Sequence, residues 1–237
     1  MRDDRMLFRL EGVLVSYQTA LSGHAEVTGL DRLNGTVFEG DFVWLSGPNG
    51  SGKTTLLGVL AGRVVTDSGL CVLGDGRSIK PEGLPRHFSV CTVFQNLAAG
   101  IVPGLTVADH LAMRALMLKR ATSRTQATAA AGRFITAHPV LRELSARKQD
   151  GAHELSGGWQ QVLQVAAGLF ARPDVLLLDE PTSHCSPATK ADLEAFIARS
   201  VSARLVVYIS HERPGPEIMG RVTKSWTLRQ GQLSEEA

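Results

Sequence analysis

The segment from Gly47 to Thr54 has residue types and a spacing suited to binding phosphate. It follows the pattern G-x-x-x-x-G-K-[ST], with an additional glycine at position 50. Glycines let successive backbone N–H groups turn toward a phosphate, and the N-terminus of a following helix adds partial positive charge. Lys53 would reach the β- and γ-phosphates, and the Thr54 hydroxyl would bind Mg²⁺. The predicted phosphate loop consists of Gly47, Pro48, Asn49, Gly50, Ser51, Gly52, Lys53 and Thr54.

A second motif is an apolar run, Val175 to Leu178, that ends in the adjacent acids Asp179 and Glu180. A carboxylate at the end of such a strand can hold Mg²⁺, directly or through water. The next carboxylate can act as a general base on the water that attacks the γ-phosphate. Two acids after a strand can also be solvated charges without a catalytic role. Because the same chain contains a phosphate loop, the metal-binding and general-base roles are favoured.

The elements predicted around the phosphate loop give it the setting that such a loop requires. Phe42 to Ser46 is a short apolar run typical of a buried strand, and Lys53 to Ala61 has the pattern of a helix that ends at Gly62. Further strands are predicted at Leu7 to Val15 and from Thr36, around a turn at residues 39–41. The order is therefore strand, glycine loop and helix.

The later part of the chain alternates between helical and strand patterns. Alanine, leucine, arginine and lysine dominate from Thr106 to about Lys148, which predicts a helical lobe. Strand patterns return at residues 175–178 and 205–209, with a helix between them at residues 189–200, so these two strands should be parallel. The sequence therefore predicts an α/β core with a helical insertion.

Composition gives no support for several classes of protein. The 237 residues carry a net charge of +2, from 25 basic and 23 acidic side chains, so charge gives no support for nucleic-acid binding. No apolar run approaches the roughly 20 residues that span a bilayer. Any membrane role would therefore depend on a separate membrane partner. The three cysteines have no metal-ligand spacing and are expected to be buried apolar residues.

Taken with four further features, these motifs make the chain resemble the ATP-binding-cassette (ABC) ATPase family over nearly all of its length. Gly47 to Thr54 resembles its Walker A motif, and Val175 to Glu180 resembles its Walker B motif with the catalytic glutamate. Leu155-Ser156-Gly157-Gly158 resembles the signature. The remaining features are Gln95 as the Q-loop glutamine, His211 as the switch histidine and Tyr17 as the aromatic residue that stacks on adenine.

The resemblance implies a P-loop NTPase (RecA-like) core with an N-terminal antiparallel β region and an inserted α-helical subdomain. The whole chain, 1–237, would be one nucleotide-binding domain, with residues 1–95 and 168–237 as the core and 96–167 as the helical subdomain. ATP and Mg²⁺ are the implied cofactors, and Thr55 joins the nucleotide-binding residues. Catalytic roles fall to Glu180, His211 and Gln95, and Mg²⁺ ligation falls to Thr54, Gln95 and Asp179.

The signature implies that two subunits share each ATP. Ser156 and the N–H groups of Gly157 and Gly158 precede a helix predicted from residues 159 to 170, so they offer donors and a positive helix end. In the family they bind the γ-phosphate held by a second subunit, which gives a homo- or heterodimer assembled by ATP. The implied further partners are transmembrane permease subunits, which would place this chain on the cytoplasmic face of the membrane.

Three positions depart from the family pattern. Trp159 stands where the family usually has glutamine, and Val162 stands where a basic residue is common. Ser186 replaces the aspartate of the D-loop, and a serine cannot supply the same charged acceptor across a dimer. We therefore expect hydrolysis that is slow or asymmetric between the two sites.

Three functions remain open from the sequence. The first is the ATPase subunit of a transporter, favoured by the segment Val102 to Leu111, which resembles the transporter-type entry to the helical lobe. The second is a soluble ABC ATPase that acts on ribosomes or another large assembly, favoured by Trp159, His184 and Arg213. The third is a nucleotide-binding regulatory subunit with little turnover. The transported substrate and the direction of transport lie outside what this sequence determines.

Overall fold

The protein is described from a computed structural model, which covers residues 5–18, 26–79, 85 and 88–236. The chain forms two compact units and passes between them more than once. The first unit comprises Met1–Phe88, Arg204–Glu212 and Val222–Ala237, and the second comprises Ser89–Ala203 and Arg213–Arg221. No helix in these described ranges is long and apolar enough to cross a membrane.

The first unit begins with a three-stranded antiparallel sheet. Strand β1 (Met6–Gln18) lies between β2 (Glu26–Phe38) and β4 (Ser68–Leu73). Inward-facing residues such as Val13 and Leu33 are fully buried, which explains why this register is stable. Strand β2 is longer than expected from its sequence, because it begins at Glu26 and not at Thr36.

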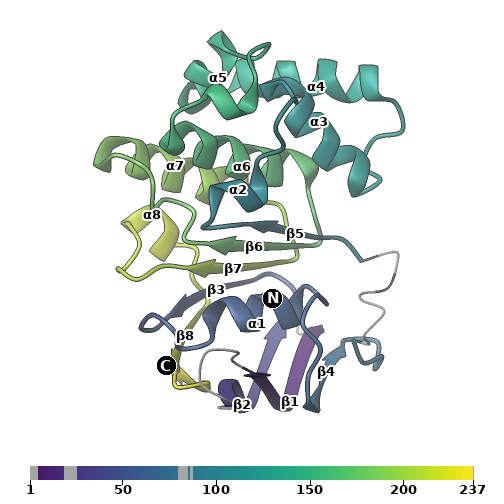
Figure 1. The fold of residues 1–237 in the computed structure, drawn as a ribbon, viewed down its shortest axis with the longest axis vertical. Helices are drawn as coiled ribbons and strands as arrows, with labels where there is room; N and C mark the ends of the chain where they lie inside the picture. Colours follow the sequence, from purple (N-terminus) through teal and green to yellow (C-terminus); the bar gives the residue numbers. More distant parts are fainter. Residues whose placement is uncertain (1–4, 19–25, 80–84, 86–87, 237) are drawn as a thin grey trace. The chain divides into compact units, whose positions relative to one another are not determined.

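A second group of strands in the first unit supports the phosphate loop. Strand β3 (Asp41–Ser46) runs parallel to β7 (Leu205–Ile209) on one side and to β8 (Lys224–Arg229) on the other. Strand β9 (Gln232–Glu236) pairs with β8 in the antiparallel direction. Helix α1 (Lys53–Leu60) follows β3 and packs beside β2 (Figure 1). The predicted strand, loop and helix are therefore present in the expected order.

The second unit contains two parallel strands and most of the helices. Strand β5 (Val90–Val93) pairs in parallel with β6 (Val175–Asp179), and α6 (Gly157–Ala171) packs against β5. Helix α3 (Val107–Met117) contacts both α6 and α4 (Arg124–Ala137), and these helices form a helical lobe (Figure 1). The remaining elements are α2 (Leu97–Gly100), α5 (Arg142–Ala146), α7 (Pro187–Ser200), α8 (Pro216–Met219) and two 3₁₀ turns, Pro139–Leu141 and Ala152–Glu154.

Side-chain caps fix where four of these helices begin. Asn96 caps the short helix α2 by accepting from Ala98 N, and three further residues cap longer helices. Thr106, Ser123 and Ser186 accept hydrogen bonds from backbone N–H groups in the first turns of α3, α4 and α7. Each cap satisfies a donor that has no partner within the helix itself, and it stabilises the helix by about 1 kcal/mol. The helical lobe predicted from residue 106 therefore starts at a capping threonine.

Candidate functional site

The phosphate loop depends on glycine at two positions where backbone approaches backbone. Gly47 and Gly52 have φ angles of 146° and 104°, in the left-handed region. A Cβ atom on Gly47 would overlap the carbonyl oxygen of Leu228, and one on Gly52 would overlap that of Gly29. Any larger residue would strain the backbone and displace a neighbouring strand. The spacing of the motif is thus explained by the structure as well as by phosphate chemistry.

Two side chains of this loop have geometry suited to a phosphate ligand. Lys53 is only 8% exposed, and its Nζ donates hydrogen bonds to the carbonyl oxygens of Gly47 and Pro48, both at 2.8 Å. The Ser51 hydroxyl is buried and forms no hydrogen bond with any described residue. A buried polar atom is normally satisfied by a protein group, water or ligand. This arrangement therefore fits a nucleotide phosphate.

The segment that carries His211 is held beside the phosphate loop. Strands β3 and β7 are parallel and adjacent, so the loop after β3 and the segment after β7 leave the same edge of the sheet. The Trp44 indole N–H donates to the Ser210 hydroxyl at 3.0 Å, and this hydroxyl donates to the carbonyl oxygen of Glu212 at 2.7 Å. These bonds fix the backbone on both sides of His211.

Tyr17 lies near the end of β1 and contacts the helix that follows the phosphate loop. Its side chain is 43% exposed, and its hydroxyl donates to Thr55 Oγ1 at 3.2 Å on the first turn of α1. Gly29 lies beneath the ring, where an added Cβ would be 2.8 Å from a Tyr17 ring carbon. The ring is therefore positioned by its hydroxyl and by a glycine while it keeps an exposed surface, as stacking on a base would require.

The second unit brings together the other predicted catalytic residues. Gln95 follows β5 and Asp179 ends β6, and these strands are paired in parallel, so both residues lie at the carboxyl edge of the pair. Asp179 and Glu180 are 5% and 8% exposed. Glu180 has a φ angle of 51°, uncommon for a non-glycine residue, and its carbonyl oxygen accepts a hydrogen bond from the Ser183 hydroxyl at 3.0 Å. Backbone strain of this kind is found at functional sites more than elsewhere.

The signature residues lie at the start of α6, which begins at Gly157, two residues earlier than the sequence predicts. Ser156 is the N-cap residue, but its side chain forms no capping hydrogen bond, and Gly157 and Gly158 begin the helix. Ser156 and Gly157 are exposed. The N–H groups of the first turn have no partner within the helix, and the helix dipole favours an anion there. The start of α6 can therefore receive a phosphate from outside this chain.

The structure gives a local reason for two of the three departures from the family pattern. Val162 is fully buried, where a basic side chain would lose its hydration. Trp159 is half-buried and lines a cavity of about 830 Å³ together with Phe196 and Arg142. Ser186 caps α7 by accepting a hydrogen bond from Thr189 N at 3.3 Å. Val162 thus serves the packing and Ser186 the capping of this chain, and nothing in the structure explains the tryptophan at position 159.

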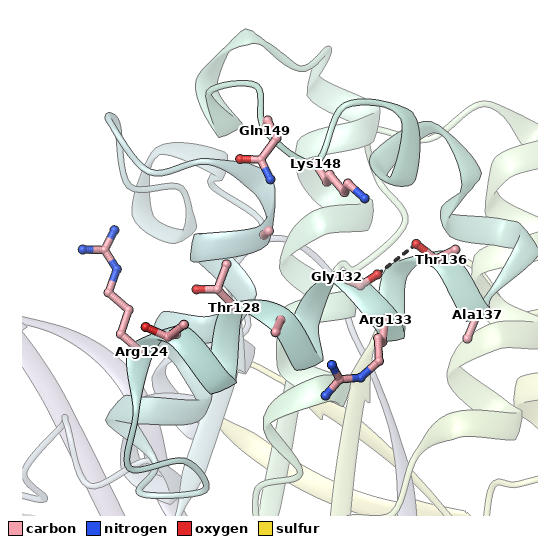
Figure 2. A pocket seen from close by; sticks show the side chains of 11 residues that line it. Arg124, Thr128, Gly132, Arg133, Thr136, Ala137, Lys148 and Gln149 are labelled. Atoms are coloured by element: carbon pink, nitrogen blue, oxygen red, sulfur yellow. Dashed lines mark hydrogen bonds between the residues drawn. The ribbon is translucent and has the colours of Figure 1, made fainter.

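A separate open groove, shown in Figure 2, lies on the helical lobe of the second unit. It has a volume of about 910 Å³. Thr128, Gly132 and Thr136 form one face of it along α4, and Lys148 and Gln149 lie across from them. Its lining includes three cations and no carboxylate: Ala108, Arg124, Thr125, Thr128, Ala129, Gly132, Arg133, Thr136, Ala137, Lys148 and Gln149.

Two residues that support the site were not identified from the sequence. Trp44 and Ser210 fix the segment around His211, but a tryptophan in an apolar strand is indistinguishable by pattern from a core residue. A polar residue at the end of a strand, just before a candidate catalytic histidine, is the only signal that Ser210 offered. The pairing of the two residues depends on the register between β3 and β7, which the sequence does not give.

The fold and the phosphate loop together define the chain as a P-loop nucleotide-binding protein. Residues 30–183 match the family described as ABC transporter. The chain belongs to this family, which confirms the prediction of an ABC ATPase of the transporter type.

Solved structures confirm the predicted fold class. A dimeric post-hydrolysis structure of the ATP-binding cassette MJ0796, bound to ADP and Pi, superposes with a TM-score of 0.81 at 23% identity, over 97% of this chain and 98% of that one. A second dimeric structure of MJ0796, described as a bacterial ABC transporter cassette, gives a TM-score of 0.79 at 22% identity, over 97% of this chain and 98% of that one. The α/β cassette fold, with its N-terminal antiparallel sheet and helical insertion, is therefore that of these proteins.

Curated relatives are transport proteins. The spermidine/putrescine import ATP-binding protein PotA of Marinobacter nauticus is 39% identical over 154 residues, which is 65% of this chain and 39% of the relative. The macrolide export ATP-binding/permease protein MacB of Rhodospirillum rubrum is 30% identical over 223 residues, which is 91% of this chain and 32% of the relative. The chain spans between about a third and about half of the length of the curated relatives it matches.

Proposed function

We propose that this chain binds and hydrolyses ATP and thereby energises transport through a separate membrane permease. The observation that supports this most directly is the phosphate loop, with its left-handed glycines, its buried Ser51 hydroxyl and the Lys53 ammonium held over it. The family membership supports the same function. The two relatives described above differ in cargo and in direction, so neither cargo is assigned to this chain.

In the bound state the phosphate loop would surround the phosphates with N–H groups, and Lys53 would contact the β- and γ-phosphates. Tyr17 would stack on the adenine, with Thr55 holding the tyrosine hydroxyl. Mg²⁺ would be held by oxygens of Thr54, Gln95 and Asp179 and would neutralise phosphate charge. These are the hard oxygen donors that Mg²⁺ prefers, and this ion usually takes only one or two protein carboxylates in addition to phosphate and water.

Hydrolysis would proceed by attack of water on the γ-phosphorus. Glu180 would accept a proton from this water, the bond between the γ-phosphorus and the bridging oxygen would break, and ADP and phosphate would leave. Gln95 would orient the water, and His211 would contact the γ-phosphate. The burial of Glu180 suits this task, because it keeps bulk water away from the carboxylate that would face the attacking water.

We further propose that the working unit is a dimer of cassettes. Ser156, Gly157 and Gly158 would bind the γ-phosphate held by the second subunit, so hydrolysis would remove a contact that joins the subunits. The exposed start of α6 supports this role. The groove of Figure 2 is the proposed contact for the permease, since its small side chains admit a helix and the charges of Arg133 and Lys148 favour an acidic partner. The third cation, Arg124, forms an ion pair with Asp109 at 3.2 Å.

The variant Glu180→Gln tests the proposed chemistry. The amide keeps the size of the side chain but cannot accept the proton, so turnover should fall at least about a hundredfold while ATP binding persists. Size-exclusion chromatography with ATP should then show a trapped dimer. The exposed glutamate in Glu217→Gln, on α8, serves as the control and should retain wild-type turnover. A wild-type chain with no ATPase activity, even with its partner, would support the low-turnover regulatory alternative instead.

Affinity purification tests the transport role. The tagged chain, expressed in its native host and extracted with mild detergent, should carry a polytopic membrane protein with it. Arg133→Glu and Lys148→Glu, which reverse two charges of the groove, should weaken this association several-fold at low salt. Recovery of ribosomes in place of a membrane protein would support the second function predicted from the sequence and contradict the transport role.

A further inference from the structure

His184 forms a hydrogen bond with the backbone of the Q-loop residue. Its ring nitrogen Nε2 lies 3.2 Å from the carbonyl oxygen of Gln95. Because a carbonyl oxygen only accepts, Nε2 carries the hydrogen in this bond. Gln95 follows β5 and His184 lies five residues beyond Asp179 at the end of β6, so the parallel pairing of these strands brings the two segments to one edge.

The backbone of His184 also contacts the signature. A Cβ atom on Gly158 would lie 2.9 Å from the His184 carbonyl oxygen, so this position accommodates a larger residue only if one of the two backbones moves. The neighbouring Cys185 Sγ lies 3.9 Å from the carbonyl oxygen of Gly158. One residue therefore touches the signature through its main chain and the Q-loop through its side chain.

We propose that His184 is a positioning residue that transmits the state of the signature to Gln95 within one subunit. This inference rests on the proposed function, in which the signature contacts a γ-phosphate that hydrolysis removes. A shift of α6 at Gly158 would press on the His184 backbone, and the imidazole would carry this shift to the Gln95 carbonyl. Both His184 and Gln95 are exposed, so this transmission would depend on the hydrogen bond between them and on the close approach of Gly158 to the His184 carbonyl oxygen.

The other bonds around Gln95 leave its carbonyl oxygen dependent on His184. The preceding N–H, that of Phe94, donates to Gln164 Oε1 at 3.3 Å. The following residue, Asn96, accepts from Ala98 N at 3.0 Å and starts α2. Gln95 thus lies between two fixed points. Among the described residues, the imidazole of His184 is the side chain that directs the carbonyl group of Gln95. The orientation of this carbonyl group fixes the peptide from which the Gln95 side chain extends.

The contact between His184 and Gln95 would also take over the role of the missing D-loop aspartate. Ser186 is used as the cap of α7 and offers no charge to a partner subunit. A contact from the D-loop to the Q-loop of the same chain provides another route by which the state of one site reaches the other. Coupling between the sites would then pass through Gly158, His184 and Gln95.

Three variants of the full chain test this role, with steady-state ATPase assays and ATP titrations. His184→Leu removes the donor, and kcat should fall about fivefold, the effect of losing one hydrogen bond. The KM for ATP should stay within twofold, because the nucleotide-binding loop lies in the first unit. His184→Gln places an N–H donor within reach and should recover at least half of the wild-type kcat. Cys185→Ala, next in sequence, should behave as wild type, since its sulfur makes only a long contact.

Hydrogen exchange separates this inference from the proposed function, since it requires no turnover. In His184→Leu the amides of residues 94–98 should exchange several-fold faster than in wild type, and His184→Gln should restore their protection. Unchanged exchange in His184→Leu would overturn the inference whether or not the chain hydrolyses ATP. Equal loss of kcat in the Leu and Gln variants, or a matching rise in KM, would also overturn it. If the wild-type chain has no ATPase activity but His184→Leu still exchanges faster, the contact between His184 and Gln95 stands and the proposed ATPase function fails.

Discussion

The carboxamide of Gln164 occupies the space that a side chain on Gly100 would need. Gln164 lies on α6 and is buried, and its Oε1 accepts the N–H of Phe94 at 3.3 Å. A Cβ atom on Gly100 would overlap this same oxygen. The helix that begins with the signature is therefore fitted to the segment that follows Gln95, by a large side chain on one element and a glycine on the other.

Gly100→Ala should destabilise the protein by about 2 kcal/mol, because the added methyl forces the Gln164 side chain or α2 to move. Chemical denaturation would measure this change. Gly132→Ala is the matched control, since Gly132 lies within α4 and an added Cβ there meets no atom within 4 Å. That substitution should stabilise the protein by up to about 1 kcal/mol.

Adding Gln164→Ala to Gly100→Ala should recover part of the lost stability, because the clash needs both side chains. The double-mutant cycle should therefore give a coupling free energy of at least about 1 kcal/mol. Strictly additive effects would show that the two positions do not meet.

Ser51→Ala should separate the contribution of this hydroxyl to stability from its contribution to ligand binding. The hydroxyl is buried and has no partner among the described residues, so its removal should change the free energy of unfolding without ATP by less than about 0.5 kcal/mol, or raise it. ATP affinity should fall several-fold, as measured by isothermal titration calorimetry, because a phosphate oxygen or a bound water loses its donor.

The control for this change is Ser46→Ala, at the end of β3. The Ser46 hydroxyl lies 2.9 Å from Thr227 Oγ1, so its loss should cost about 1 kcal/mol of stability. Wild-type ATP affinity in Ser51→Ala would contradict the assignment of this hydroxyl to the phosphate site.

Substitutions at Ser186 test its role as a helix cap. Ser186→Ala removes the acceptor of the Thr189 N–H and should lower the free energy of unfolding by about 1 kcal/mol. Ser186→Asp should keep the cap and add a charge that the start of α7 favours, so stability should equal or slightly exceed that of wild type. Thermal denaturation of both variants gives the answer. Unchanged stability in Ser186→Ala would mean that the cap does not form in solution.

Much of this arrangement was predictable because local sequence patterns encode it. The glycine spacing from Gly47 to Thr54 predicted the loop, and the apolar run before Asp179 predicted β6. The contacts of His184 and Gln164 were not predictable. Gln164 bonds to a residue 70 positions away and His184 to one 89 positions away, so both contacts depend on how β5, β6 and α6 pack. A glutamine inside an apolar helix pattern gives no sign of the backbone group that it will meet.

The start of β2 shows a second limit. The sequence predicts a strand from Thr36, where apolar and β-branched residues are dense, but β2 extends back to Glu26 through a stretch that is mostly polar residues and glycine. Pairing with β1 decides this extension, since Tyr17 lies opposite Val27 and Ser16 opposite Thr28. Strand propensity depends on such cross-strand neighbours more than on the residue itself.

A buried histidine in the helical lobe should make the protein less stable in mild acid. His110 on α3 is fully buried, and its Nε2 accepts the N–H of Val102 at 3.3 Å, which requires the neutral ring. Burial, with a smaller contribution from the charge of Arg114, lowers the pKa of His110 from 6.5 to about 4. Between these two values the unfolded chain binds a proton that the folded chain does not. Stability from this group is therefore complete above about pH 6.5 and is lost as the pH falls toward 4.

The expected loss from this one group between about pH 7 and about pH 4.5 is roughly 2 kcal/mol. Urea denaturation of the wild type and of His110→Gln at both pH values isolates the contribution of His110 to stability, because all other titrating groups are common to the two proteins. The wild type should lose about 2 kcal/mol more than the variant over this interval. The same pH dependence in both would show that His110 is protonated in the folded protein at a pKa near its ordinary value, and that the Val102 N–H has another acceptor.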